Sequence, residues 1–124
     1  MISFSVVGQP VPQGSMKVIN GHVIHSRGSA LAAWRSNVAL EARKAGAFPT
    51  RDPITLNMTF MLTRPRTVKR REPTVPPDLD KLVRAVLDAL TAIAYLDDSQ
   101  VTEIFARKVY GDLPGAHIEI IEKN

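Results

Sequence analysis

The chain has 124 residues, a length that suits one domain with a single hydrophobic core. Hydrophobic residues make up 44% of it, which excludes a disordered protein, and its apolar runs are far shorter than the about 20 residues of a membrane helix. It contains no cysteine, which excludes disulfides and thiolate zinc sites. We expect a cytoplasmic protein, because residues 1–7 lack a basic start and resemble a strand rather than a signal peptide.

The net charge of +4 hides an asymmetry along the chain. Residues 1–77 contain 11 Lys and Arg against 3 Asp and Glu, whereas residues 78–124 contain 5 against 9. A basic segment suits a polyanion such as DNA, and clustered carboxylates suit a cation. An ordinary basic surface would give the same balance, so charge alone does not choose between these interpretations.

Hydrophobic periodicity and turn residues predict the elements along the chain. In chain order they are strand 2–7, hairpin strands 17–19 and 22–25, helix 30–45, strand 54–62, helix 79–93, strand 100–110 and strand 116–121. Asn20-Gly21 favours the positive φ values of a two-residue hairpin turn. Gly46 would stop the first helix, and four prolines make residues 63–77 a loop. We therefore expect one α+β domain over residues 1–124, with a mixed or antiparallel sheet covered by two helices.

The second helix has the clearest pattern. Its apolar residues recur at helical spacing and would form one buried stripe: Leu79, Leu82, Val83, Val86, Leu87 and Leu90. Asp80, Arg84 and Asp88 follow at intervals of four and therefore line up on one side of the helix.

Carboxylates stand at both ends of this helix. Asp78 and Asp80 lie where it begins, and Asp97-Asp98 follow it. Mg²⁺ takes carboxylate oxygens as ligands, and a metal held beside a basic surface can cut a phosphodiester. Aspartate at a helix start can also simply cap backbone N–H groups, so the spacing alone leaves both interpretations open.

These residues resemble the RusA family of Holliday-junction resolvases, which are small phage- and prophage-type endodeoxyribonucleases. Residues 77–90 are similar to its Asp-x-Asp-Asn-x-x-Lys helix start, and residues 95–101, which contain Asp-Asp-Ser-Gln, to its Asp-Asp-x-Gln turn. Residues 8–14 resemble its opening Pro-x-Pro-Lys-Gly loop. The resemblance implies that Asp78, Asp80 and Asp98 converge as ligands of Mg²⁺, with Mn²⁺ as an alternative.

Convergence of the three aspartates is geometrically demanding. A helix over residues 79–93 is about 20 Å long, and Asp98 follows its far end. Asp98 reaches Asp78 and Asp80 only if the next strand runs back beside the helix, or if a second chain contributes. The role of Asp97, the neighbour of Asp98, is less defined: it is either a turn residue or an auxiliary residue of the metal site.

Two positions of the helix depart from the family pattern. Arg84 stands where the family has a catalytic lysine, and Lys81 stands where asparagine is more common. Arginine stays protonated, so Arg84 could stabilise charge on the phosphate but could not donate a proton, a role open to Lys81. Arg84 could instead bridge Asp80 and Asp88 structurally, with Asp88 as its orienting partner.

A basic loop precedes the carboxylates. Its five cations are Arg64, Arg66, Lys69, Arg70 and Arg71. They would grip DNA phosphates beside the active site, and Lys17 would be a secondary phosphate contact. The alternative is a solvated, flexible loop.

Together these features predict a Mg²⁺-dependent endodeoxyribonuclease that resolves Holliday junctions and other branched DNA by paired symmetric nicks, in recombination and repair. Two symmetric cuts imply a homodimer, acting in the cytoplasm of a bacterium or phage-infected cell and not at a membrane. The alternatives are a catalytically weak junction-binding module, or a flap or nonspecific metal nuclease.

Overall fold

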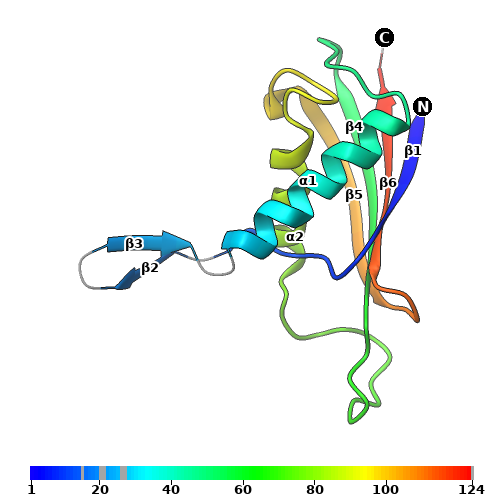
Figure 1. Cartoon of the computed structure of the whole chain (residues 1–124). Coiled ribbons are helices and arrows are strands. Elements are labelled where there is room, and N and C mark those ends of the chain that lie inside the picture. The colour runs from blue at the N-terminus through cyan, green and yellow to red at the C-terminus, as the bar shows by residue number, and fades with distance from the viewer. Residues whose placement is uncertain (15, 20–21, 26–27, 124) are drawn as a thin grey trace.

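A four-stranded sheet covered on one face by two helices forms the body of the protein (Figure 1). This computed structural model describes the backbone of residues 1–14, 16–19, 22–25 and 28–123, and the side chains of residues 1–14 and 28–123. In chain order the elements are β1 (Ile2–Val7), β2 (Met16–Ile19), β3 (His22–His25), α1 (Gly28–Lys44), β4 (Ile54–Leu62), α2 (Leu79–Leu90), the 3₁₀ helix η1 (Asp98–Gln100), β5 (Val101–Tyr110) and β6 (Gly115–Glu122). The predicted α+β class is confirmed.

The main sheet is mixed and has the strand order β1-β6-β4-β5. β6 pairs antiparallel with both β1 and β4, whereas β4 and β5 are parallel. A parallel pair needs a crossover connection, and α2 is the helix within it. β4 and β5 therefore end at the same edge of the sheet, a fact that matters for the basic loop.

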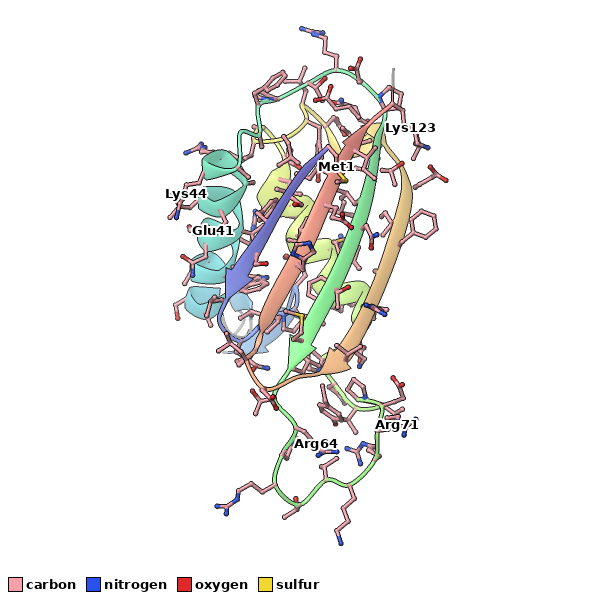
Figure 2. All side chains as sticks on the ribbon, turned by 90° about the vertical axis from the view of Figure 1, so that its right-hand side faces the viewer. Met1, Glu41, Lys44, Arg64, Arg71 and Lys123 are labelled. Carbon is pink, nitrogen blue, oxygen red and sulfur yellow. The ribbon has the colours of Figure 1, made fainter. Side chains whose placement is uncertain are left out.

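The core lies between this sheet and the two helices. In β4 the alternating residues Leu56, Met58 and Phe60 are fully buried. They pack in one cluster with residues of α1 such as Val38 and of α2 such as Val86. Figure 2 shows the sheet from its other face, with both helices behind it. No helix of the described ranges is both long and apolar enough to cross a bilayer.

β2 and β3 pair as a separate antiparallel hairpin that projects from the body (Figure 1). The predicted strands are thus confirmed. The Asn20-Gly21 turn lies outside the described residues, and so do Ser26 and Arg27 before α1.

The second helix is shorter than predicted, ending at Leu90 rather than at residue 93. Thr91 is extended, and Ala92 takes a positive φ of 66°. Tyr95 is completely buried, and its hydroxyl donates to the Leu87 carbonyl at 2.8 Å. The chain leaves the helix early because this side chain must reach the core, a demand that helical periodicity does not reveal.

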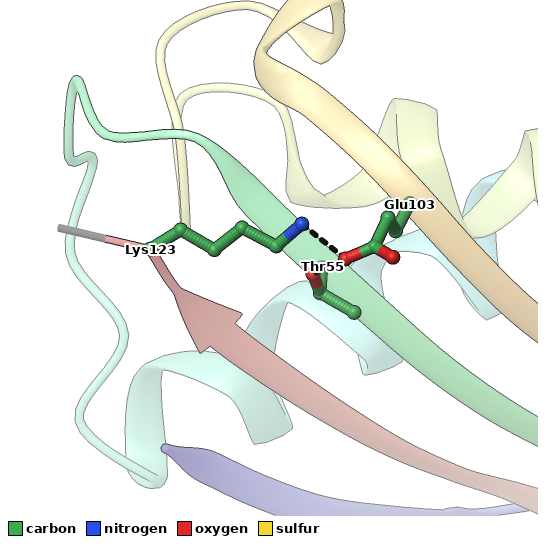
Figure 3. Close-up of polar contacts among 3 residues, drawn as sticks. All are labelled: Thr55, Glu103 and Lys123. Carbon is green, nitrogen blue, oxygen red and sulfur yellow. Dashed lines mark hydrogen bonds and ion pairs between the residues drawn. The ribbon is translucent and has the colours of Figure 1, made fainter.

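A polar cluster joins β4, β5 and the end of the chain on the open face (Figure 3). Thr55 Oγ1 donates to the Glu103 carboxylate at 3.0 Å, and the Lys123 ammonium contacts the same oxygen. Both contacts lower the pKa of Glu103, and the hydrogen bond from Lys123 has the larger effect. The cluster lies at the end of the sheet opposite the basic loop (Figure 2).

Candidate active site

Asp78 occupies the N-cap position of α2 with an exposed carboxylate. Its carbonyl accepts from the N–H groups of Lys81 and Leu82, both at 3.1 Å. Within the described chain, its carboxylate makes no capping hydrogen bond. Capping therefore does not account for the acid at this position, and the carboxylate is available to a ligand from solvent.

Asp80 lies in the first turn of α2, where its carboxylate accepts from the Lys81 ammonium at 2.8 Å. This hydrogen bond is the largest of the causes that lower the pKa of Asp80. The pair is exposed, so it contributes little to stability. It does keep Asp80 anionic, the state in which a carboxylate binds a cation.

Two distant segments fix the start of α2. The backbone N–H of Gln13, in the loop after β1, donates to the Lys81 carbonyl at 3.0 Å. The Lys108 ammonium, from β5, donates to the carbonyls of Val75 and Pro77, both at 2.8 Å. Lys108 therefore holds the segment that leads directly into Asp78. Sequence reasoning missed Lys108, because nothing in a strand pattern shows which loop its side chain will meet.

Asp98 lies at the other end of α2. It lines a cavity of about 370 Å³ together with residues from the C-terminal part of α2, the following turn and α1: Arg35, Asp88, Thr91, Leu96 and Asp97. Burial first, and then the charges of Asp98 and Asp88, raise the pKa of Tyr95. The 12 residues of α2, about 18 Å in length, lie between Asp78 and the turn that carries Asp98.

One chain therefore does not bring the three aspartates together. β5 does run back beside α2 toward Asp78, but Asp98 stands just before β5 and stays at the far end (Figure 1). Among the residues that the structure describes, no group of three or more Asp, Glu, His or Cys side chains could hold a metal ion. The return of β5 beside α2 therefore does not by itself carry Asp98 to Asp78 and Asp80.

Gln100 explains the turn that carries Asp98. Its Oε1 accepts from the N–H groups of Leu96 and Asp97, both at 2.9 Å. Its Nε2 donates to the carbonyls of Thr50 at 2.8 Å and Asp52 at 3.0 Å. Gln100 thus fastens the turn to the segment before β4 and fixes where Asp98 is presented.

Asp97 belongs to the same turn as its capping residue. Its carboxylate accepts from the Ser99 N–H at 2.9 Å, and this hydrogen bond lowers the pKa of Asp97. The interpretation of Asp97 as a turn residue is confirmed.

Arg84 is exposed on α2, one turn beyond Asp80. Among the described residues, neither Asp80 nor Asp88 lies within 4.0 Å of its guanidinium as an ion pair, and Asp80 pairs with Lys81 instead. The structural bridge considered for Arg84 is absent from this part of the chain. Its guanidinium remains a candidate for a phosphate contact.

The basic loop extends beyond the edge of the sheet, with Arg64 and Arg71 on its two arms (Figure 2). Arg66, Lys69 and Arg70 are exposed as well. Lys17 lies in β2, and its side chain is outside the described part of the structure. The loop follows the end of β4 and returns directly to Asp78, so its cations are continuous with the start of α2.

Comparison with known proteins identifies the family of the chain. Residues 8–121 match the family model of the endodeoxyribonuclease RusA. The chain is also similar to the uncharacterized protein YqaN of Bacillus subtilis (strain 168), with 33% identity over 138 aligned residues that cover 98% of this chain and 96% of that protein. The match includes the loop after β1, the start of α2 and the Gln100 turn. The chain belongs to the RusA endodeoxyribonuclease family.

Proposed function

We propose that the protein is a Mg²⁺-dependent endodeoxyribonuclease that resolves Holliday junctions and related branched DNA by paired symmetric nicks, in recombination and repair. One observation supports this most. The Asp78 carboxylate is exposed and makes no capping hydrogen bond in the described chain, and it lies beside an anionic Asp80, directly after the basic loop. Capping therefore does not use this carboxylate, whereas a metal-dependent nuclease needs carboxylates that are open to a cation.

Asp78, Asp80 and Asp98 are the residues that would hold the metal. Their donors are all carboxylate oxygens, which fit Mg²⁺ and also accept Mn²⁺. Bound there, the ion would lower the pKa of a water molecule and neutralise charge on the phosphate. Lys81, held against Asp80, and Arg84, one turn further on, would contact the phosphate oxygens and stabilise charge that develops on them.

Separation of the aspartates supports a site shared between two chains of a homodimer. Asp78 and Asp80 lie at one end of α2, and Asp98 lies at the other. Two copies related by a twofold axis, with their α2 helices antiparallel, would bring Asp98 of each chain to Asp78 and Asp80 of its partner. Such a dimer would have two identical sites, as paired cuts require.

Mixing two inactive variants tests the shared site. Asp78→Asn and Asp98→Asn should each abolish cleavage of a labelled four-way junction in Mg²⁺ while retaining its binding in EDTA. In a mixed dimer, one site carries both substitutions and the other carries neither, so co-refolded variants should nick one strand. A mixture as inactive as either variant alone would refute the shared site, because a site built within one chain cannot be restored by mixing.

Lys81 and Gln13 offer a second test of the site. Gln13 stands where the family loop has lysine, Lys81 stands where the family helix has asparagine, and the structure joins the two backbones by a hydrogen bond. We infer that Lys81 supplies from the helix the positive charge that the loop supplies elsewhere. Lys81→Asn should reduce cleavage, and adding Gln13→Lys should restore it; no rescue would refute the exchange.

The second candidate function is a junction-binding module without catalysis. The observation that favours it is the distance between Asp98 and Asp78 within one chain. Incubation of the protein with a four-way junction, with and without Mg²⁺, separates the two functions. Paired nicks at symmetric positions support the nuclease, and binding without any nick supports the module.

A further inference from the structure

A basic cavity lies where the loop over residues 63–77 meets the ends of β4 and β5. Both strands end at this edge because they are parallel, and the Gly111 N–H closes the edge by donating to the Leu62 carbonyl at 3.0 Å. The cavity measures about 370 Å³, and its lining comes from both arms of the loop and from the turn after β5: Arg64, Lys69, Arg71, Tyr110, Gly111 and Asp112. We call it the basic cavity.

Its charges are unbalanced. Three cations face one carboxylate, that of Asp112. In the described residues, no carboxylate lies within 4.0 Å of Arg64, Lys69 or Arg71 as an ion-pair partner. Like charges that converge without a partner repel one another, and an anion in the cavity would remove that repulsion.

Tyr110 adds a second, independent observation. Its hydroxyl is buried, and no hydrogen-bond partner for it exists among the described residues. A buried hydroxyl without a partner is costly, so such groups commonly mark the place of a missing ligand or water. Tyr110 also lines the basic cavity, so an anion bound there would supply the missing partner once the side chain turns its hydroxyl toward it.

The loop that carries the basic cavity also has packed parts. On its other side, Tyr110 lines a smaller recess of about 100 Å³ with Leu62 and the prolines of the loop, Pro65, Pro73, Pro76 and Pro77. Pro73 is buried. The Val68 N–H donates to the Pro65 carbonyl at 3.0 Å and turns the loop back. This packing holds the two basic arms around one space.

We propose that the basic cavity binds one backbone phosphate of the DNA substrate, at a distance from the phosphate that is cut. Arg64, Lys69 and Arg71 neutralise this phosphate, and the Tyr110 hydroxyl donates to it. The proposal rests on the proposed function, since DNA is the ligand. It goes further by dividing the five loop cations into three that bind a defined phosphate and two, Arg66 and Arg70, that add only diffuse attraction.

A phosphate held there would set the register of the DNA strand. The loop runs from the basic cavity through Pro76 and Pro77 to Asp78, and Lys108 ties this segment to β5. The distance along the DNA between the bound phosphate and the phosphate at Asp78 is then fixed by the protein. Cleavage position would follow from that distance.

Single alanine variants test the division of the loop. Binding to a labelled four-way junction is measured by fluorescence anisotropy in EDTA over a series of salt concentrations, with Arg43→Ala, in the last turn of α1, as the baseline for losing one charge. Arg64→Ala and Arg71→Ala should each weaken binding about tenfold and reduce the salt slope by about one. Arg66→Ala and Arg70→Ala should weaken it no more than about threefold. Equal losses for all four would overturn the proposal.

Tyr110→Phe and Asp112→Asn give predictions of opposite sign. Tyr110→Phe should weaken binding about threefold to tenfold while the melting temperature stays the same or rises, because it deletes a hydroxyl that lacks a partner in the free protein. Asp112→Asn should tighten binding, since it removes the one repulsive charge. Wild-type affinity in Tyr110→Phe would overturn the role of the hydroxyl.

A scan with neutral methylphosphonate linkages locates the phosphate. One position in each arm should lower the affinity of the wild-type protein, and the same position should lose its effect in Arg71→Ala. A uniform profile would refute the basic cavity even if the protein cleaves junctions. A junction that shows the expected profile but is never cut in Mg²⁺ would instead refute the nuclease and retain the cavity.

Discussion

Lys108→Met removes the contact that holds the chain ahead of Asp78 and retains most of the side-chain stem. The ammonium makes two hydrogen bonds of 2.8 Å, to the carbonyls of Val75 and Pro77. Hydrogen bonds to charged groups contribute about 1.5–3 kcal/mol each when well shielded. Lys108 is only partly buried, so we expect a loss of about 1–2 kcal/mol for both hydrogen bonds together, or a fall in melting temperature of about 4–8 °C.

We expect Lys108→Met to reduce the cleavage rate more strongly than it reduces the stability of the fold. Pro77 directly precedes Asp78, and a displacement of about 1 Å at a reacting group can reduce the rate by about 100-fold. Cleavage of a four-way junction is measured well below the melting temperature over a range of Mg²⁺ concentrations. We expect a strong loss of rate and a higher Mg²⁺ requirement, with junction binding in EDTA nearly unchanged.

Arg107→Met is the matched control for this experiment. Arg107 precedes Lys108 in β5 but points to the other face of the sheet, where it donates to Thr59 Oγ1 at 3.2 Å. The control also loses one positive charge. Equal cleavage rates and equal Mg²⁺ requirements in the two variants would refute the positioning role of Lys108.

Other substitutions test the rest of the site and the fold. Gln100→Leu removes four hydrogen bonds that fix the Asp98 turn, so the melting temperature should fall by more than about 5 °C and cleavage should fall with it; an unchanged melting temperature would show that the turn does not need Gln100. Arg84→Lys should retain substantial cleavage and Arg84→Ala should lose it, and an active alanine variant would exclude phosphate stabilisation by Arg84. Because Lys123 and Thr55 lower the pKa of Glu103, this carboxylate stabilises the fold above its ordinary pKa of 4.5, and the stabilisation is lost as the pH falls through the lowered value. Melting curves of wild type and Lys123→Met should therefore differ near neutral pH and converge in acid; a constant difference would contradict this.

Local pattern determined most of the secondary structure. The alternation over residues 54–62 follows from one face of β4 being buried, and β4 has the predicted bounds. The apolar stripe of α2 follows from its position over the sheet, and the helix was located correctly at its start. Its early end was missed, because Tyr95 bends the chain to enter the core, and periodicity does not report a tertiary contact of a single side chain.

The motif residues were likewise visible in the sequence, but their spatial relations were not. Spacing marked Asp78, Asp80 and Asp98 as candidates and raised the difficulty of bringing Asp98 across the length of α2. Only the tertiary structure showed that β5 leaves Asp98 at the far end of the helix, and that Gln100 fixes it there.

The contacts of the basic loop were the feature that could least be predicted from the sequence, because they depend on the tertiary structure. Sequence identified five cations as one charged run. The parallel pairing of β4 and β5 brought the turn after Tyr110 to the base of that loop, and it brought Lys108 to Pro77. A sequence encodes which groups are charged and which faces are apolar, because these depend on neighbours in the chain. Which distant groups meet depends on strand order and direction, and these are set by the packing of the whole core.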